Sequence, residues 1–212
     1  MPKSFVPAAR FSSLTPVYDL ACRLIGLGAR FRAFERTLLE DTPVRRVLEV
    51  GCGTGELLVE LARRYPGAEV VGLDPDPAAL GIARRKLEGA RLPARLDQGL
   101  AATLPYPDAS FDLVVSSLML HHLDTSNKLR MLRECRRVLT GRGQLVLVDF
   151  GQPRNRIARW LTWPLRFRIF EEQADNFRGR VPGLMTEAEL AFEVVGTYGP
   201  VVVAYRARRA RG

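Results

Sequence analysis

The chain has 212 residues, 47% of them hydrophobic, and this length and composition favour a single α/β domain and exclude a disordered chain. No apolar run reaches the roughly 18 residues of a membrane span, and the N-terminus lacks a signal-peptide core, so we expect a cytoplasmic protein. Three scattered cysteines and two histidines predict neither a disulfide framework nor a metal site. The formal charge of +9 suits nucleic acid or an anionic membrane, but the arginines are spread along the chain, which favours a solvated basic surface.

The predicted elements alternate between helices and strands. Thr15-Pro16 is an N-cap followed by a proline of the first turn, and it predicts a first helix. A second helical run, with Phe31 and Phe34 on its apolar face, ends before Pro43. After it we predict, in chain order, a strand at 45–50, a helix at 56–65, a strand at 69–73, a helix at 78–87, a short strand near 91–96, a strand at 111–116, a helix at 126–139 ended by Gly141 and Gly143, and a strand at 144–150.

The order of these elements predicts the fold. Strands that read as continuous apolar runs between helices indicate a parallel sheet buried on both faces. The last two predicted strands, 192–197 and 201–207, are joined by three residues, too few for a parallel crossover. We therefore predict one α/β domain over 1–212, with a doubly wound, mostly parallel seven-stranded sheet that ends in an antiparallel hairpin. Residues 1–42 form an N-terminal helical cap and 151–190 an insert or lid between the fifth and sixth strands.

The stretch RVLEVGCGTGE, at 46–56, places a glycine-rich turn directly after the first strand. In a doubly wound sheet, a ligand binds beyond the carboxyl ends of the strands, at such a turn. The GxGxxG fingerprint fails because Glu56 holds its last position, and a carboxylate there repels phosphate. Glu49 lies inside the apolar strand, where a carboxylate needs a cationic partner or backbone N–H donors. The pattern therefore predicts a ligand without phosphates, and an amino group on it would pair with Glu49.

Asp74 ends the second predicted strand, 19 residues after Gly55. An acidic residue at that distance from the loop can accept hydrogen bonds from both hydroxyls of a ribose. The loop and Asp74 together describe a nucleoside with an amino-bearing tail and no pyrophosphate. S-adenosylmethionine fits that description.

Four stretches of the chain resemble the class I S-adenosylmethionine-dependent methyltransferases, specifically the small-molecule branch that includes the quinone-biosynthesis C-methyltransferases. They occur in the family's order and spacing, cover about 38–150, and read VLEVGCGTGEL, VVGLDPDPAAL, LPYPDASFDLVVSSLMLHHL and RECRRVLTGRGQLVLVDFG. The terminal hairpin is similar to the antiparallel seventh strand of that family's fold. The resemblance implies S-adenosylmethionine as the cofactor and a methyltransferase activity.

The resemblance also implies the cofactor-binding residues. Glu49 and the loop would border the methionine end, Asp74 would hold the ribose, and Ser116 would line the floor. The full set implied by the matching positions is Tyr18 of a lid dipeptide, Glu49, Gly51, Cys52, Gly53, Asp74, Pro75 beside the adenine, Leu100, Ala101 and Ser116. One position departs from the family, which has an acceptor for the adenine amino group where this chain has Leu100. We expect the backbone of Ala101, with Asp97 nearby, to meet the adenine, and cofactor binding to be weaker by one hydrogen bond.

Methyl transfer asks for positioning above all, and a general base helps when the acceptor loses a proton. His121 is the catalytic candidate, because it and His122 follow the fourth strand on the ligand side and are the only histidines. The alternative is that one histidine packs at the loop and the other caps Asp124. Asp149, at the end of the fifth strand, is a second candidate, but we interpret it first as a solvated turn carboxylate.

The insert carries both tryptophans, Trp160 and Trp163, and five arginines between Arg154 and Arg168. It is interpreted as a substrate lid, or as a peripheral membrane contact through 154–170. The predicted function is methyl transfer from S-adenosylmethionine to a small, hydrophobic acceptor such as a quinone, phenol or lipid, with no nucleic-acid partner. The alternative is an RNA- or nucleotide-binding protein of the same fold whose basic charge contacts phosphate.

Overall fold

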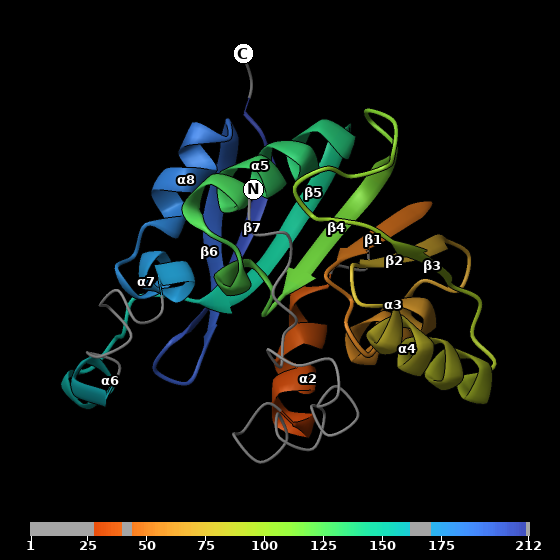
Figure 1. Cartoon of the computed structure of the whole chain (residues 1–212), viewed down its shortest axis with the longest axis horizontal. Coiled ribbons are helices and arrows are strands. Elements are labelled where there is room, and N and C mark those ends of the chain that lie inside the picture. The colour runs from red at the N-terminus through yellow and green to blue at the C-terminus, as the bar shows by residue number, and fades with distance from the viewer. Residues whose placement is uncertain (1–27, 40–43, 162–170, 211–212) are drawn as a thin grey trace.

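A seven-stranded sheet runs through the centre of the computed structural model, which describes residues 28–39, 44–161 and 171–210 (Figure 1). The strand order is β3-β2-β1-β4-β5-β7-β6. The first five strands pair in parallel, and β7 is antiparallel to both β5 and β6. This confirms the predicted sheet and its terminal hairpin. The strands are β1 (Arg46–Val50), β2 (Glu69–Asp74), β3 (Arg95–Gln98), β4 (Phe111–Ser117), β5 (Leu139–Phe150), β6 (Leu190–Tyr198) and β7 (Val202–Arg209).

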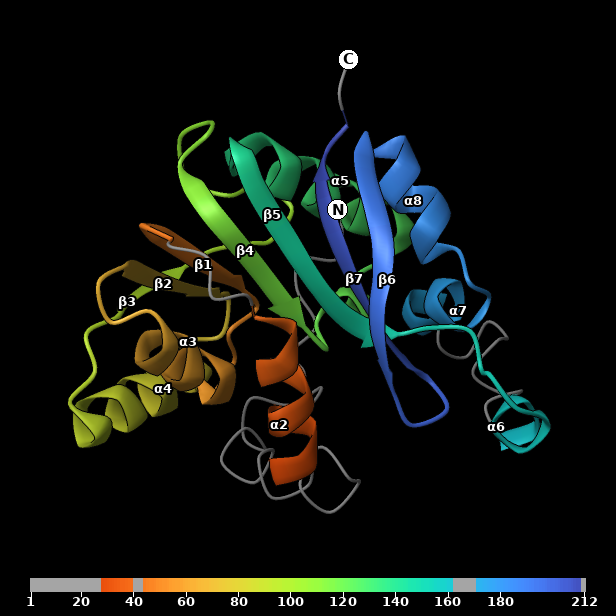
Figure 2. The same ribbon diagram turned by 180° about the vertical axis from the view of Figure 1, so that it is seen from behind.

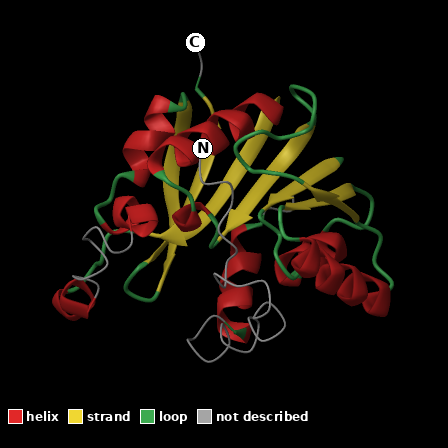
Figure 3. Cartoon of the chain, viewed as in Figure 1, coloured by secondary structure: helices red, strands yellow, loops and turns green. Residues whose placement is uncertain are grey.

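Helices cover both faces of this sheet (Figure 3). α2 (Ala29–Leu38), α3 (Glu56–Arg64) and α4 (Pro77–Ala90) lie on one face, and α5 (Thr125–Val138) and α8 (Val181–Glu187) on the other (Figures 1 and 2). The shorter helices are η2 (Leu120–His122), α6 (Arg156–Leu161) and α7 (Glu171–Phe177). Among the described residues, no helix has the length and apolar character needed to cross a membrane. The helix expected to begin at Thr15-Pro16 lies outside the described residues.

Alternating side chains of each strand enter two separate cores. In β1, Val47 packs with α2 and α3, whereas Leu48 and Val50 pack on the side of α5 and α8. In β4, Leu113 and Val114 divide in the same way. Because successive side chains of a strand point to opposite faces, an unbroken apolar run is what a sheet covered on both sides requires.

Two predicted element bounds were wrong. The third strand is Arg95–Gln98 and not 91–96, because α4 continues to Ala90 and Arg91 closes it in a left-handed conformation with φ of 54°. β5 begins at Leu139, five residues before the predicted strand, so Gly141 and Gly143 lie in the strand and do not end the helix. A Cβ at Gly143 would lie 2.9 Å from the carbonyl oxygen of Phe111, so glycine here permits close backbone approach between β4 and β5.

Gly55, the N-cap of α3, offers a test of packing between α3 and α4. Its φ is +80°, and a Cβ there would lie 2.7 Å from the Cβ of Ala83. We expect Gly55→Ala to lower the free energy of unfolding by about 2–4 kcal/mol, since left-handed strain and overpacking add. Gly53→Ala is the matched control, because φ is +51° but nothing lies within 4 Å of its Cβ position, so only strain of about 1–2 kcal/mol applies. Equal losses for both variants in urea unfolding would show that the contact with Ala83 is unimportant.

Candidate cofactor site and active site

The glycine-rich turn is tied to the neighbouring strand by backbone hydrogen bonds. The N–H groups of Gly51 and Cys52 donate to the carbonyl of Leu73 at 2.8 and 3.0 Å. These bonds hold the turn at the carboxyl ends of β1 and β2, where the fold places ligands. The sequence-predicted loop therefore lies beside Asp74, as expected.

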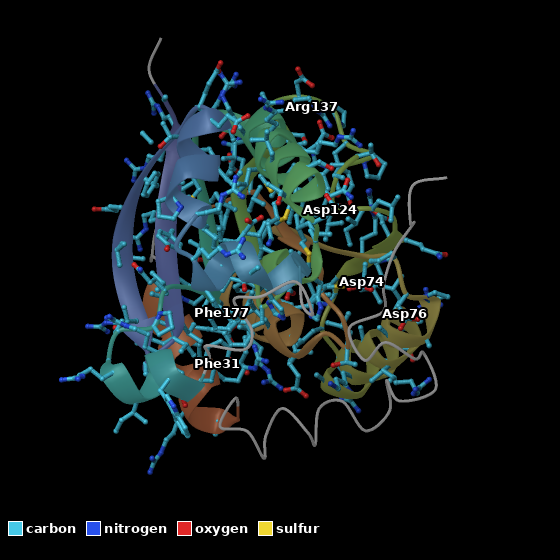
Figure 4. The ribbon with its side chains drawn as sticks, turned by 60° about the vertical axis from the view of Figure 1, so that its left-hand side comes forward. Phe31, Asp74, Asp76, Asp124, Arg137 and Phe177 are labelled. Atoms are coloured by element: carbon cyan, nitrogen blue, oxygen red, sulfur yellow. The ribbon has the colours of Figure 1, made fainter. Side chains whose placement is uncertain are left out.

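Asp74 organises the loop with both of its carboxylate oxygens. Oδ2 accepts from the backbone N–H of Gly53 and Oδ1 from that of Asp76, each at 2.9 Å. Figure 4 labels Asp74 and its neighbour Asp76 in the view with side chains. The side chain is 9% exposed, and burial raises its pKa although the two N–H bonds oppose this. Each carboxylate oxygen can accept a second hydrogen bond, so acceptor capacity remains for ligand hydroxyls. Asp76 has a different role, because its Oδ1 caps α4 by accepting from Ala78.

Glu49 is a buried carboxylate with an unsatisfied oxygen. Its side chain lies in β1, the residue is 3% exposed, and Oε2 has no hydrogen-bond partner among the described residues. Burial is the main cause that raises its pKa well above the usual range; the charges of Glu35 and Asp74 add to this and Arg32 opposes it. A buried acceptor without a donor costs about 1–3 kcal/mol, so a ligand that brings a donor or a cation would be favoured here.

The other predicted binding residues differ in burial and in hydrogen bonding. Ser116 is fully buried and its Oγ has no hydrogen-bond partner in the described part of the chain, so it too could receive a ligand. Cys52 is buried and packs in the core beneath the loop. The carbonyl of Pro75 accepts from Gln98 at 3.1 Å. Leu100 is 46% exposed, and Ala101 packs against the core.

Asp97, which the sequence also brought forward, is bound to other side chains. The carboxylate of Asp97 accepts from Tyr106 at 3.0 Å and from Arg95 at 2.6 Å, so it is engaged within β3 and the loop that follows. Tyr18 lies outside the described residues.

Sequence reasoning missed Glu35 of α2. It is 2% exposed, and its two oxygens accept from the hydroxyl of Ser117 and the guanidinium of Arg32. Its charge also reaches Glu49. The signal was its helical spacing, because Glu35 falls four residues after Phe31 and three before Leu38, on the buried face of the helix.

The state of Glu49 predicts that cofactor binding releases a proton. Burial raises its pKa and so favours the protonated form in the free protein, whereas pairing with an ammonium group requires the carboxylate. Over the pH range in which Glu49 of the free protein is protonated and the α-amino group of the ligand is also protonated, affinity for S-adenosylmethionine should rise with pH by up to roughly tenfold per unit. It should fall as the pH is lowered, because the proton on Glu49 must then be displaced.

Calorimetry in two buffers of different ionisation enthalpy measures this proton directly. Wild-type protein should release up to one proton per ligand bound. Glu49→Gln should release none and bind more weakly, with a flat pH profile over the same range. Proton release that persists in Glu49→Gln would assign it to another group, such as Asp74 or Glu35.

His121 belongs to a buried hydrogen-bonded cluster at the ends of β4 and β5. Its Nδ1 lies 2.8 Å from Oδ1 of Asp149, which also accepts from Asn176 at 3.2 Å and from the backbone N–H of Phe150 at 2.7 Å. Burial of Asp149 alone would raise its pKa, but the charge and hydrogen bond of His121, with other donors, leave it lowered. An ionised Asp149 fixes the proton of His121 on Nδ1 and leaves Nε2 as an acceptor.

Two interpretations of this segment need correction, that of Asp149 as a solvated carboxylate and the alternative in which a histidine caps Asp124. Asp149 is fully buried and not a solvated turn carboxylate, because Asn176 of α7 and η2 cover the end of β5. Neither histidine caps Asp124, whose carboxylate caps α5 by accepting from Asn127. His122 stacks on His121 with ring centroids 4.0 Å apart, and burial together with the charge of His121 lowers its pKa to about 3, so it stays neutral.

The cofactor loop and the segment that carries His121 meet at Met119. A Cβ added to Gly51 would lie 2.2 Å from Cγ of Met119, which precedes η2 by one residue. The candidate nucleoside site at β1 and β2 and the buried pair of His121 and Asp149 at β4 and β5 therefore lie at the carboxyl ends of neighbouring strands. With this strand order and an acidic residue ending β2, the fold is that of the Rossmann-like methyltransferases.

Comparisons with known proteins agree. A family model described as a methyltransferase domain matches residues 47–143. The demethylmenaquinone methyltransferase of Deinococcus radiodurans is 41% identical over 146 residues, which are 68% of this chain and 59% of that protein. An uncharacterized methyltransferase of Synechocystis is 38% identical over 152 residues, 70% of this chain and 67% of that protein. The chain belongs to the class I S-adenosylmethionine-dependent methyltransferases.

Solved structures support the fold. A putative methyltransferase from Bacillus halodurans has a TM-score of 0.70 and 19% identity, over 86% of this chain and 100% of its own. The chain spans less than two thirds of the length of the Deinococcus relative.

Proposed function

We propose that the chain transfers a methyl group from S-adenosylmethionine to a small, hydrophobic acceptor of the hydroquinone or phenol class. The observation that carries this proposal is the buried Oε2 of Glu49, which has no hydrogen-bond partner within the described part of the chain and lies close enough to Asp74 for the two charges to interact. A cationic amino group on the ligand satisfies the first carboxylate and vicinal hydroxyls satisfy the second. A ligand that carries a phosphate would gain nothing from either.

The residues present fit the cofactor. Glu49 would pair with its amino group, Asp74 would accept from its ribose, and Pro75 and Ala101 would flank its adenine. When bound, S-adenosylmethionine supplies a methyl group already activated by the sulfonium. Leu100 offers no acceptor to the adenine amino group, so binding there depends on backbone and apolar contact. One absent hydrogen bond is worth about 0.5–1.5 kcal/mol, which weakens affinity without removing it.

His121 is proposed as the general base. An acceptor carbon or hydroxyl gains the methyl group and loses one proton, and Nε2 of His121 takes that proton. Asp149 is a positioning residue, since it holds Nδ1 of His121 and stabilises the imidazolium that forms. The same pair then returns the proton to solvent.

Two observations support a hydrophobic, planar acceptor. Aromatic rings gather beside His121: Phe150 lies 4.7 Å from it between centroids, and Phe150 and Phe177 stack at 5.6 Å. The Deinococcus relative is named for demethylmenaquinone, a substrate we extend to this chain only as a class. A nucleic-acid-binding module, the alternative raised by the basic charge, has no use for a carboxylate buried beside the glycine-rich turn.

The test uses the full chain with methyl-labelled S-adenosylmethionine and a demethylmenaquinol bearing a short prenyl chain. We expect one labelled methyl group on the quinol by mass spectrometry, with S-adenosylhomocysteine as the co-product. Cofactor binding with methylation of other phenols but not of the quinol would correct the acceptor. Absence of cofactor binding would overturn the function itself.

A further inference from the structure

The short helix α6 exposes two large apolar side chains. Ile157 is 72% exposed and Trp160 is 77% exposed. Both views of the ribbon show α6 projecting from the body of the protein (Figures 1 and 2). Isolated exposed apolar residues are common, but a tryptophan and an isoleucine one turn apart on a projecting helix form a small exposed apolar patch.

The start of α6 is fixed to the rest of the fold. The side chain of Asn155 accepts from the N–H of Ala158 at 2.7 Å, and Ala158 itself is 5% exposed. The backbone N–H of Arg154 donates to Pro200 at 3.0 Å, and its guanidinium donates to Thr197. These contacts attach α6 to the β6–β7 hairpin, so its two exposed apolar residues have a defined direction.

The charged residues next to these two in the sequence are all basic. Arg154, Arg156 and Arg159 are exposed, and the sequence from 150 to 170 contains no aspartate or glutamate. Across the described residues, Arg156 and Arg159 take part in no ion pair. Guanidinium groups beside a tryptophan suit the phosphate level of a bilayer, where the ring sits at the interface and the arginines reach anionic headgroups.

We propose that this α6 patch, made of Arg154, Arg156, Ile157, Arg159 and Trp160, docks the protein on an anionic lipid bilayer. The patch begins a few residues after β5, whose end carries Asp149 and positions His121. Docking would therefore bring the active-site edge of the sheet toward the membrane, where a lipophilic acceptor dissolves. The docking itself is independent of the proposed reaction, because neither apolar residue belongs to the cofactor site or the acid–base pair.

The test is co-sedimentation of the full chain with vesicles, without cofactor. Vesicles of phosphatidylcholine alone are compared with an equal mixture of phosphatidylcholine and phosphatidylglycerol, at near-physiological salt. We expect binding to the anionic vesicles only. The double variant Ile157→Ser/Trp160→Ser and the double variant Arg156→Gln/Arg159→Gln should each bind at least tenfold more weakly.

Matched controls separate the patch from general properties of the surface. Val194→Ser removes another exposed apolar side chain, on β6, and Arg130→Gln another exposed arginine, on α5; both should bind like wild type. Circular dichroism and S-adenosylmethionine affinity should be unchanged in every variant, which keeps this result distinct from the proposed function. Unaltered vesicle binding by the Ile157→Ser/Trp160→Ser variant, or binding to an acidic polypeptide but not to vesicles, would overturn the proposal.

Discussion

Asp74→Ala should weaken S-adenosylmethionine binding by about 100-fold or more. In the proposed complex the carboxylate accepts from both ribose hydroxyls, and a hydrogen bond to a charged group is worth about 1.5–3 kcal/mol. Loss of two such bonds exceeds roughly 3 kcal/mol, and each 1.4 kcal/mol is about tenfold in affinity. The variant also leaves the N–H of Gly53 without its acceptor, so the loop loses its order as well. Isothermal calorimetry measures the change.

The neighbouring Asp76 supplies the control for Asp74. Asp76→Asn keeps an oxygen that can cap α4, because asparagine is as good an N-cap as aspartate, and it should bind the cofactor like wild type. Urea unfolding of both variants separates a loss of ligand contacts from a loss of fold. If a folded Asp74→Ala protein bound S-adenosylmethionine as tightly as wild type, Asp74 would not be the residue that binds the ribose.

His121→Ala should lower kcat by about 10²–10⁴-fold, the usual contribution of a general base. Cofactor affinity should stay within about twofold of wild type, because general-base catalysis acts on proton transfer and not on cofactor binding. The reason lies in the structure, since the carboxylate of Asp149 holds Nδ1 of His121, which leaves Nε2 as the nitrogen for proton transfer. Single-turnover rates with labelled cofactor measure the chemical step.

Asp149→Asn and His122→Ala resolve how the histidine is held. Asp149→Asn should lower kcat at least about tenfold with little change in KM, because the asparagine amide cannot stabilise an imidazolium. His122→Ala should leave the rate within about threefold, since a histidine with a pKa of about 3 takes no proton at neutral pH. A larger loss of kcat for His122→Ala than for His121→Ala would show that His122, and not His121, is the general base.

Apolar periodicity was sufficient to predict most of the sheet, because β1, β2, β4 and β5 are buried on both faces over most of their length and so contain apolar runs. β3 has the weakest apolar pattern among the parallel strands, and its bounds were also predicted wrongly. The start of β5 was missed because two glycines normally end a helix, and only the contact of Gly143 with β4 explains why they lie in a strand here.

The candidate site was predictable where it is local in sequence and not where it is assembled from distant elements. Glu49, the loop and Asp74 follow from strand ends and spacing alone. Asp149 pairs with His121 across 28 residues, through the adjacency of β4 and β5, and the buried state that decides its chemistry comes from α7. Glu35 lies on α2, and the spacing of residues in that helix predicts its burial but not its contact with Ser117 of β4.

Calorimetry with S-adenosylmethionine, S-adenosylhomocysteine and NAD on one sample of the wild-type chain tests whether the glycine-rich turn at the carboxyl ends of β1 and β2 holds the methyl donor. Both sulfur-containing nucleosides should bind at one site per chain, and NAD should give no heat, since its pyrophosphate would meet the carboxylate of Glu56 at the start of α3. Binding of NAD without binding of either nucleoside would contradict the account.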